Sequence, residues 1–397
     1  MKKTYIDTAM ERIAPDLILK GGNVVDVFSG RVIKADVIIK DGIICGVGSY
    51  SGENEQDVSG KYIMPGFIDS HVHIESSMTQ PSEYAKAVMP HGITTVIADP
   101  HEITNVCGED GLEFMLKSAK NIPLDVNLML PSCVPATPFE HTGANLDAKT
   151  TQKLAPKFFG IGEMMNYPGI VSGDDETLGK LCLDIVDGHA PLLSGHELDA
   201  YASAGIKTDH ECSVVEEMTE KISKGMYILL REGTLSLDVA KLIKGVTPYT
   251  LRRCAFCTDD RFVGEIIRDG SIDHCIRKAV SLGLNNIDAI IMATLNACEI
   301  YGMKNKGAIA PSYVADIVVA DDLNLSSISQ VYKNGKLVCE NGKALFECET
   351  VDNSKVTNTV HLPKISADFF KTDVKDKFDA IELIPESIIT KKVTVSY

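Results

Sequence analysis

The middle of the chain, residues 63–304, repeats one pattern, in which a short apolar run is followed by a stretch with helical spacing. The runs that we expect to form strands are residues 67–72, 94–98, 126–130, 158–162, 183–186, 204–208, 226–230 and 254–257. The expected helices are residues 109–120, 174–184, 214–224 and 235–244, followed by 262–282 and 286–301. Eight repeats in about 240 residues have the pattern and size of an α/β protein with a TIM-like (β/α)8 barrel.

Both flanks of this region contain short apolar runs separated by turn residues, which is typical of short strands joined by turns. Asp41-Gly42 and Asn334-Gly335 each stand between two apolar runs, and both pairs are strong hairpin signals. We therefore expect a small composite β-sandwich domain that is built from both flanks. The expected division is a first part of the sandwich at residues 1–62, the barrel at 63–304, the second part of the sandwich at 305–350 and a further segment at 351–397.

This last segment contains two runs, residues 380–384 and 388–395, that alternate between apolar and polar side chains like strands of a sheet. About 45 residues bury too little surface to form a core of their own, and unpaired strand edges invite association. We expect the residues from about 351 onward to pack against the sandwich or the barrel, or else to be mobile.

The composition excludes some classes of partner. Asp and Glu total 55 against 39 Lys and Arg, and this net charge of −16 disfavours binding to nucleic acid or to an anionic membrane surface. No apolar run approaches the ~18 residues of a membrane span, and the first residues lack the apolar stretch of a signal peptide. The eleven cysteines have no framework spacing and are expected to stay reduced in the cytoplasm.

Histidines concentrate where the expected strands end, which is where barrel enzymes carry their catalytic groups. Of the ten histidines in the chain, five occupy such positions, namely His71, His73, His101, His189 and His210. His71 and His73 are two residues apart on a strand, so both imidazoles face the same side. A pair of polar strand-end residues without a ligand is the alternative interpretation.

Two carboxylates at other strand ends, Glu163 and Asp259, favour a metal site over that alternative. Six nitrogen and carboxylate ligands at one barrel mouth can hold two divalent ions, with one carboxylate bridging them. Arg231-Glu232, at the end of the seventh expected strand, is either an internal ion pair or a substrate contact, and we favour the ion pair. Asp260 is expected to point away from Asp259, because neighbouring strand residues face opposite sides.

The residues Met64-Pro65-Gly66-Phe67-Ile68-Asp69-Ser70-His71-Val72-His73 resemble the opening signature of the amidohydrolase superfamily. Further motifs are similar to those of the bacterial and archaeal adenine deaminase family within it, at residues 71–77, 99–103, 162–169, 187–191, 208–211 and 231–233. The resemblance covers about residues 15–390. It implies that the family continues into a C-terminal domain, most of which this chain lacks.

The resemblance also implies a binuclear metal centre in which Glu163 replaces the carboxylated lysine of many superfamily members. One metal is then held by His71, His73, Glu163 and Asp259, and the other by Glu163, His189 and His210. Mn²⁺ or Fe²⁺ suits such a mixed nitrogen and oxygen site, and Zn²⁺ also matches the ligand types.

The implied activity is hydrolytic deamination of adenine to hypoxanthine and ammonia in purine salvage, by a metal-bridging hydroxide. Asp259 is expected to accept the proton of this hydroxide and to pass it to the departing amine. His101 and Glu102 are expected to act in catalysis and, with Glu75, to bind the base; the alternative for each of the three is that it only positions a metal ligand. The implied assembly is a cytoplasmic homo-oligomer, a dimer.

Two other functions compete with this one. The first is another amidohydrolase that acts on a cyclic amide, and Glu163 together with the Asp99-Pro100-His101-Glu102 segment weighs against it. The second is a catalytically weak or silent, truncated paralogue. The presence of all six ligands weighs against a silent protein.

Overall fold

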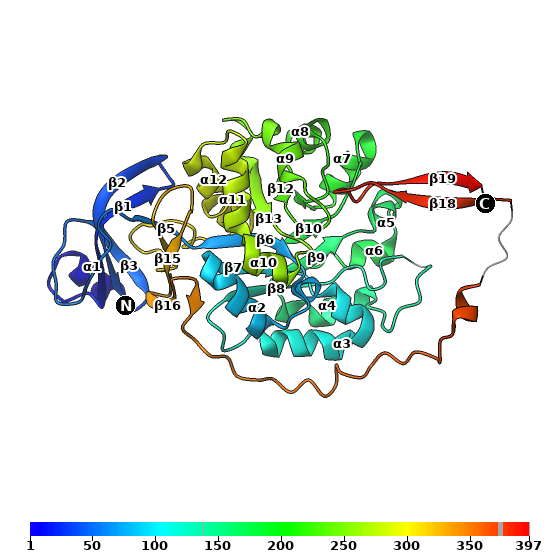
Figure 1. The fold of residues 1–397 in the computed structure, drawn as a ribbon, viewed down its shortest axis with the longest axis horizontal. Coiled ribbons are helices and arrows are strands. Elements are labelled where there is room, and N and C mark those ends of the chain that lie inside the picture. The colour runs from blue at the N-terminus through cyan, green and yellow to red at the C-terminus, as the bar shows by residue number, and fades with distance from the viewer. Residues whose placement is uncertain (138, 372–375, 397) are drawn as a thin grey trace.

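Two curled parallel sheets form the middle of the molecule (Figure 1). The computed structural model describes residues 1–137, 139–371 and 376–396. One sheet has the order β10-β9-β8-β7-β6 and the other the order β11-β12-β13, and all pairings are parallel. The bounds are β6 (Phe67–Val72), β7 (Ile93–Ala98), β8 (Asp125–Leu130), β9 (Gly160–Met164), β10 (Val186–Gly188), β11 (Thr208–Asp209), β12 (Tyr227–Arg231) and β13 (Cys254–Cys257).

Two short seams connect these sheets. Val72 of β6 forms a parallel bridge with Asp259, which follows β13, and the amide of Asp259 donates to the carbonyl of His71 at 3.0 Å. At the other seam, the amide of Gly188 in β10 donates to the hydroxyl oxygen of Thr208 in β11 at 3.0 Å. The first and last of the eight parallel strands are therefore neighbours.

Helices connect the strands, and their bounds are α2 (Pro81–Val88), α3 (His101–Ser118), α4 (Ala148–Leu154), α5 (Tyr167–Ser172), α6 (Asp175–Gly179), α7 (Gly195–Ser203), α8 (Val215–Ser223), α9 (Val239–Leu242), α10 (Val263–Asp269), α11 (Ile272–Ser281), α12 (Asn286–Met292) and α13 (Leu295–Ile300). A further helix, α1 (Lys2–Ala9), begins the chain. Short 3-10 turns are η1 (Ile74–Ser77), η2 (Met89–His91), η3 (Ala155–Lys157), η4 (Ile243–Gly245), η5 (Leu251–Arg253) and η6 (Ala367–Phe370).

Two expected long helices are each divided, which corrects the sequence-based prediction. Gly270 separates α10 from α11 with a φ of 99°, and the amide of Ser271 is satisfied by the carboxylate of Asp273 at 2.7 Å. Thr294 leaves the helical conformation between α12 and α13. The expected helix at 174–184 is only the five-residue α6, which ends at Gly179, a residue with low helix propensity.

Three strands lie further along the chain than their apolar runs predicted. β9, β10 and β11 extend over Glu163, Asp187 and Asp209, and all three side chains are buried. The predicted runs stopped before these residues because carboxylates look like loop residues in a sequence. Here the strands continue into the polar residues that gather at their carboxyl ends.

Both flanks of the chain meet in one nine-stranded sheet, with the order β17-β16-β15-β14-β5-β1-β2-β3 and β4 paired to β1. Its strands are β1 (Leu17–Asp26), β2 (Arg31–Lys40), β3 (Ile43–Gly48), β4 (Glu55–Asp57), β5 (Tyr62–Pro65), β14 (Ile317–Ala320), β15 (Ile328–Lys333), β16 (Lys336–Glu340) and β17 (Lys343–Ala344). Asp41-Gly42 and Asn334-Gly335 form two of its hairpin turns with positive φ at all four residues, which confirms the predicted turns.

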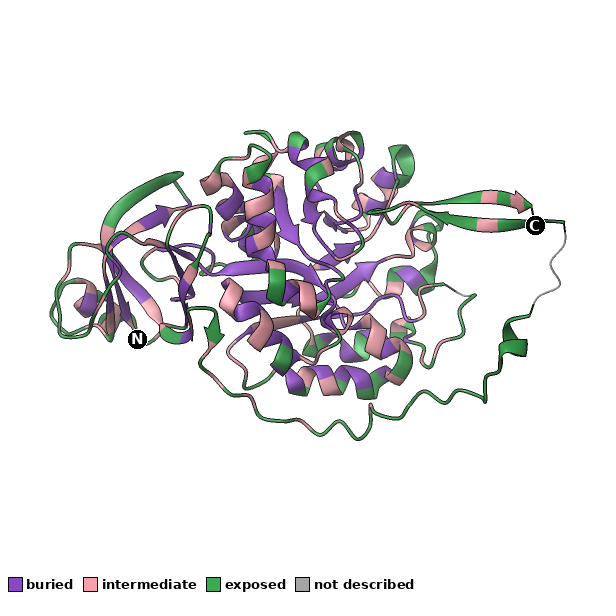
Figure 2. Ribbon diagram, viewed as in Figure 1, coloured by how far each residue is buried: buried purple, intermediate pink, exposed green. Residues whose placement is uncertain are grey.

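The segment after β17 runs along the outside of the middle region and ends in a hairpin of β18 (Lys377–Leu383) and β19 (Thr390–Ser396) (Figure 1). The predicted strand character of this segment is confirmed. Most hairpin residues are exposed, and its turn reaches the parallel strands (Figure 2). Across the part of the chain that the structure describes, no helix has the length and apolar character to cross a membrane.

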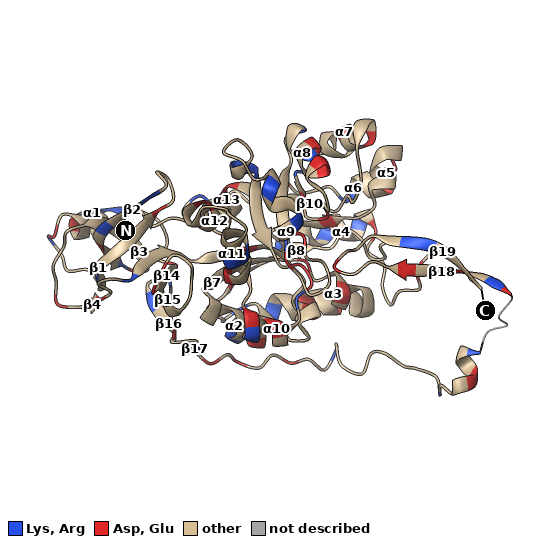
Figure 3. Cartoon of the chain, turned by 45° about the horizontal axis from the view of Figure 1, so that its top comes forward, with Lys and Arg blue, Asp and Glu red and all other residues tan. Residues whose placement is uncertain are grey.

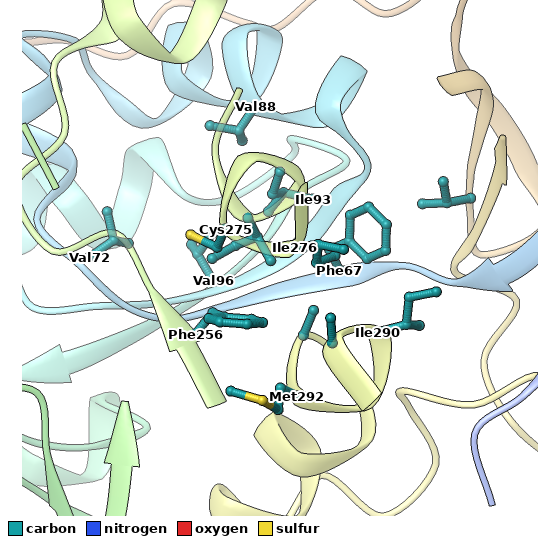
Figure 4. Close-up of a cluster of buried hydrophobic side chains, with 14 of the residues drawn as sticks. Phe67, Val72, Val88, Ile93, Val96, Phe256, Cys275, Ile276, Ile290 and Met292 are labelled. Carbon is teal, nitrogen blue, oxygen red and sulfur yellow. The ribbon is translucent and has the colours of Figure 1, made fainter. Parts of the chain in front are cut away.

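Apolar side chains pack between the first strands and the last helices (Figure 4). Phe67 of β6 and Ile93 of β7 face Ile276 of α11 and Ile290 of α12, and all four are at most 1% exposed. Phe256 of β13 belongs to the same cluster. Because β12 and β13 are buried on both sides, most of their residues form continuous apolar runs rather than alternating ones.

A buried cluster of charges connects the nine-stranded sheet to the parallel strands. The carboxylate oxygen Oδ2 of Asp316 lies 2.8 Å from the ammonium of Lys306 and 2.7 Å from that of Lys333. Both ammonium groups also contact Asp125, the first residue of β8. Burial alone would raise the pKa of Asp316, but the two lysines lower it below its usual value.

We expect Asp316→Ala to lower the free energy of unfolding by about 3 kcal/mol or more, because it leaves two buried ammonium groups with less compensation. Asp321→Ala, which breaks the exposed pair with Lys61, should cost less than about 1 kcal/mol. Urea unfolding of both variants measures the difference. Since the folded pKa of Asp316 is depressed, its contribution is present above about pH 4 and is lost as the pH falls through that folded pKa. Equal unfolding free energies for the two variants would contradict this.

Candidate metal centre

The strand ends bring six side chains together at one place. They are His71 in β6, His73 directly after it, Glu163 in β9, His189 after β10, His210 after β11 and Asp259 after β13. Asp259 has a φ of 56°, which is uncommon outside glycine, and the carbonyl of this residue accepts from the amide of His73 at 3.2 Å. The backbone therefore places the carboxylate of Asp259 against the first strand.

Glu163 lies between two groups of histidines. Its oxygen Oε1 is 3.4 Å from Nε2 of His73. Its oxygen Oε2 is 2.6 Å from Nδ1 of His189 and 3.2 Å from Nε2 of His210. The two oxygens of one carboxylate thus face different sets of imidazoles, which is the arrangement that a bridging ligand needs.

His71 and His73 point to the same side of β6. Their Nε2 atoms are 3.1 Å apart, and Oδ1 of Asp259 lies 3.0 Å from Nε2 of His73 and 3.8 Å from Nε2 of His71. Nδ1 of His71 faces Asp187 at 3.4 Å, and the carboxylate of Asp187 also accepts from the hydroxyl of Tyr301 at 2.9 Å. Such a partner on the outer nitrogen orients a metal-binding imidazole.

The donor set fits divalent cations. In several groups the ligand atoms lie within 4.8 Å of one another, and these groups include His71, His73 and Glu163; His71, His210 and Asp259; and Glu163, His189 and His210. Both ring nitrogens of His210 and Oε2 of Glu211 are buried without a hydrogen-bond partner, and each such group costs about 1–3 kcal/mol. A bound cation would satisfy these atoms.

The charge of the cluster supports the same conclusion. Burial alone would lower the pKa of His210, but Glu163 and Glu211 raise it well above its usual value. His73 behaves in the same way, because Glu102 and Asp259 outweigh burial and raise its pKa. The carboxylates thus provide more negative charge than neutral imidazoles can balance, and divalent cations would compensate it.

His101 and Glu102 line the cavity beside this cluster, as a role in catalysis or binding requires. Nδ1 of His101 is 3.3 Å from Oε1 of Glu163, and Oε1 of Glu102 is 3.5 Å from Nδ1 of His73. Glu75 is not among the described residues that line the cavity, and it accepts from the amide of Ile103 at 3.4 Å. Burial and the neighbouring Glu102 raise the pKa of Glu75 to about 8.

Arg231 has different partners from the one that the sequence suggested. Its guanidinium contacts Glu211, Asp238 and, at 2.8 Å, Oδ2 of Asp259. The expected pair with Glu232 is wrong, because neighbouring residues on an extended chain face opposite sides. Glu232 instead contacts Lys278.

The expectation that Asp260 points away is also wrong. Asp260 lines the cavity and accepts from the hydroxyl of Ser76. The left-handed conformation of Asp259 interrupts the alternation of the strand, so the two carboxylates are no longer on opposite sides.

Sequence reasoning assigned no role to Glu211, which lies 3.2 Å from Nε2 of His210 and 3.5 Å from Nδ1 of His189. Its position directly after a strand-end histidine was a usable signal. No comparable signal marked Ile388, which comes from the C-terminal hairpin and lines the same cavity.

The cavity has a volume of about 990 Å³. Its floor consists of the histidines and carboxylates, and its rim is apolar, with Met78, Met165, Leu235, Phe262 and Ile388. A concave site with a few convergent polar groups and an apolar wall is typical of a small-molecule site.

Imidazoles and carboxylates that converge at the carboxyl ends of curled parallel strands define a metal-dependent hydrolase. The chain belongs to the amidohydrolase family, whose family model matches residues 62–338. Adenine deaminase of Clostridium acetobutylicum is 48% identical over 397 residues, which cover 98% of this chain and 70% of that protein. Adenine deaminase 2 of Desulfotalea psychrophila is 46% identical over 402 residues, which cover 99% of this chain and 70% of that protein.

Solved structures share the fold at low sequence identity. A D-aminoacylase structure, described for its binuclear metal centre, has a TM-score of 0.61 at 16% identity and covers 83% of this chain and 98% of that one. The β-aspartyl dipeptidase of Fervidobacterium islandicum AW-1 has a TM-score of 0.60 at 20% identity and covers 85% of this chain and 99% of that one.

We expect Glu163→Gln to weaken metal binding strongly. Loss of a residue that only orients a metal ligand lowers metal affinity by about 10- to 100-fold, and loss of Glu163 should lower it by more. The amide keeps the size of the side chain but loses the charge and one of two acceptor oxygens that face the histidines. Elemental analysis after loading with Mn²⁺ and dialysis measures the bound metal. Glu75→Gln is the control and should bind as much metal as the wild type. Equal metal content in both variants would contradict a bridging Glu163.

Proposed function

We propose that the chain is an adenine deaminase, which converts adenine and water to hypoxanthine and ammonia. The observation that carries this proposal is the 48% identity to a curated adenine deaminase over 98% of the chain. The site supports it, because a cluster of imidazoles and carboxylates lies at the floor of a cavity that is large enough for a purine.

The proposal includes a closed barrel. The bridge between Val72 and Asp259 at one seam, and the hydrogen bond from Gly188 to Thr208 at the other, support closure of β6 to β13 into a (β/α)8 barrel. The nine-stranded sheet, which both flanks build together, supports the proposed composite sandwich domain. The proposed division remains residues 1–62 and 305–350 for the sandwich, 63–304 for the barrel and 351–397 for the further segment.

We assign two divalent ions, Mn²⁺ or Fe²⁺ with Zn²⁺ as a further match, to the cluster. His71, His73, Glu163 and Asp259 would hold one, and Glu163, His189 and His210 the other. When bound, such ions lower the pKa of water and make hydroxide available near neutral pH. The division of the Glu163 oxygens between two sets of histidines supports this assignment.

Asp259 is the proposed proton carrier. It accepts a proton from the attacking water and passes it to the amine that leaves carbon 6 of adenine. Arg231 holds Oδ2 of Asp259 at 2.8 Å, so Oδ1 stays directed toward His73. His101 and Glu102 line the cavity and are placed to orient the ring nitrogens. We also propose that Glu75, whose carboxylate accepts from the amide of Ile103, helps to bind the base.

A cytoplasmic homodimer is also part of the proposal. All eleven cysteines are free in the structure, which suits a reducing compartment. Sedimentation of the purified protein tests the dimer.

The decisive experiment measures ammonia release by the metal-loaded protein from adenine, adenosine, guanine and cytosine, together with ring opening of dihydrouracil. We expect ammonia from adenine alone, in a stoichiometric ratio with hypoxanthine. Ring opening of dihydrouracil without attack on adenine would instead show that the protein is a hydrolase of cyclic amides. If none of the compounds reacts, the proposed hydrolase activity is wrong.

The variant Asp259→Asn should reduce kcat for adenine by about 10²-fold or more, because the amide keeps the size of the side chain but cannot accept the proton. Asp260→Asn removes an equal charge from the same cavity and should have a smaller effect. Steady-state kinetics at matched metal content separates the two. Near-normal turnover of Asp259→Asn with its metal bound would mean that another group carries the proton.

A further inference from the structure

The turn of the C-terminal hairpin reaches the cavity above the metal centre. Residues 384–389 connect β18 to β19, and Ile388 in this turn lines the cavity with Leu235 and Phe262. The strands themselves project away from the barrel (Figure 1). The turn thus contributes to the cavity wall, although it is distant in sequence from the metal-binding cluster.

A hydrogen-bonded chain ties the turn to the centre. The ammonium of Lys241 donates to the carbonyl of Glu386 at 2.5 Å and lies 2.9 Å from Oδ1 of Asp238. Oδ2 of Asp238 accepts from Arg231 at 3.0 Å, and Arg231 contacts Asp259. The same buried carboxylate therefore orients the lysine that holds the turn and the arginine that holds the proposed proton carrier.

Ile388 is less exposed than two apolar residues of the adjoining strand β18. Ile388 is 37% exposed, whereas Ile381 and Leu383 on β18 are 73% and 78% exposed. The strands also carry charges on their outer surface, where Glu382 pairs in register with Lys391 (Figure 3). Most residues of the two strands are exposed, and the contacts of the turn are its hydrogen bond with Lys241 and the place of Ile388 in the cavity lining.

A purine in this cavity would bind better against an apolar wall. Its 990 Å³ is near the upper limit of sites for drug-sized ligands, about 1,000 Å³, and an unsubstituted purine is much smaller than such a ligand. The edge of a purine carries its hydrogen-bonding nitrogens, which suit the polar floor. Its two flat faces are largely apolar and gain free energy when an aliphatic or aromatic side chain excludes water from them.

We propose that Ile388 is a substrate-contacting residue: its side chain, together with Leu235 and Phe262, packs on a face of the purine ring and holds carbon 6 toward the metal centre. This inference rests on the proposed adenine deamination. It makes the C-terminal hairpin a part of the active site, whose contribution is to binding and not to proton transfer.

The test compares two isoleucines of the same hairpin. Ile388→Ser should raise KM for adenine about five- to ten-fold while kcat changes less than about two-fold, since a lost apolar contact weakens binding in the ground state and transition state alike. Ile388→Leu, which keeps an aliphatic side chain of the same volume, should restore KM to within about two-fold of the wild type. Ile381→Ser, on the exposed strand, should leave both constants unchanged.

Circular dichroism and metal content are measured for every variant, so that a folding defect is recognised. An unchanged KM in Ile388→Ser overturns the inference, and so does a fall in kcat at constant KM. An equal rise of KM in Ile381→Ser also overturns it, because the effect would then come from the hairpin as a whole. If the wild-type protein does not release ammonia from adenine, the proposed function is wrong, and this outcome is seen before any variant is compared.

Discussion

The carboxylate of Glu163 is the interaction on which the site depends. Its two oxygens face His73 on one side and His189 and His210 on the other, within 2.6–3.4 Å. This contact joins strands β6, β9, β10 and β11 at one point, although the residues are up to 137 positions apart in the chain. Curled parallel strands whose carboxyl ends converge provide this geometry, because the three histidines directly follow their strands.

Burying so many charged groups together requires mutual compensation. An isolated charge in a protein interior is costly, and removing one partner from a buried pair costs several kcal/mol. Arg231 meets this requirement for Glu211, Asp238 and Asp259, and it contacts all three carboxylates with one guanidinium. The planar guanidinium of arginine has enough N–H donors to contact three carboxylates in a fixed geometry. A lysine ammonium would interact with them only as a point charge.

The same principle operates outside the metal-binding cluster. Lys306 and Lys333 share the carboxylates of Asp125 and Asp316, where the nine-stranded sheet meets the parallel strands. Lys241 connects the C-terminal turn to Asp238. Charged groups with a buried partner thus lie at two of the contacts between the parallel-strand region and the segments around it.

The sequence by itself determined the alternation of strands and helices, the two hairpin turns at Asp41 and Asn334, and the clustering of histidines at strand ends. These features depend on local periodicity and turn chemistry, which neighbouring residues specify. The wrong strand bounds, such as β9, arose because buried carboxylates at strand ends have no apolar signature.

Only the tertiary structure decided the partners of individual side chains. Arg231 contacts three carboxylates and not that of its neighbour Glu232. Asp260 lines the cavity because Asp259 takes a left-handed conformation. The position of Ile388 depends on a chain path that no local pattern encodes. Local periodicity predicts which face of an element is buried, but which distant charge or cavity meets that face depends on how all the elements pack together.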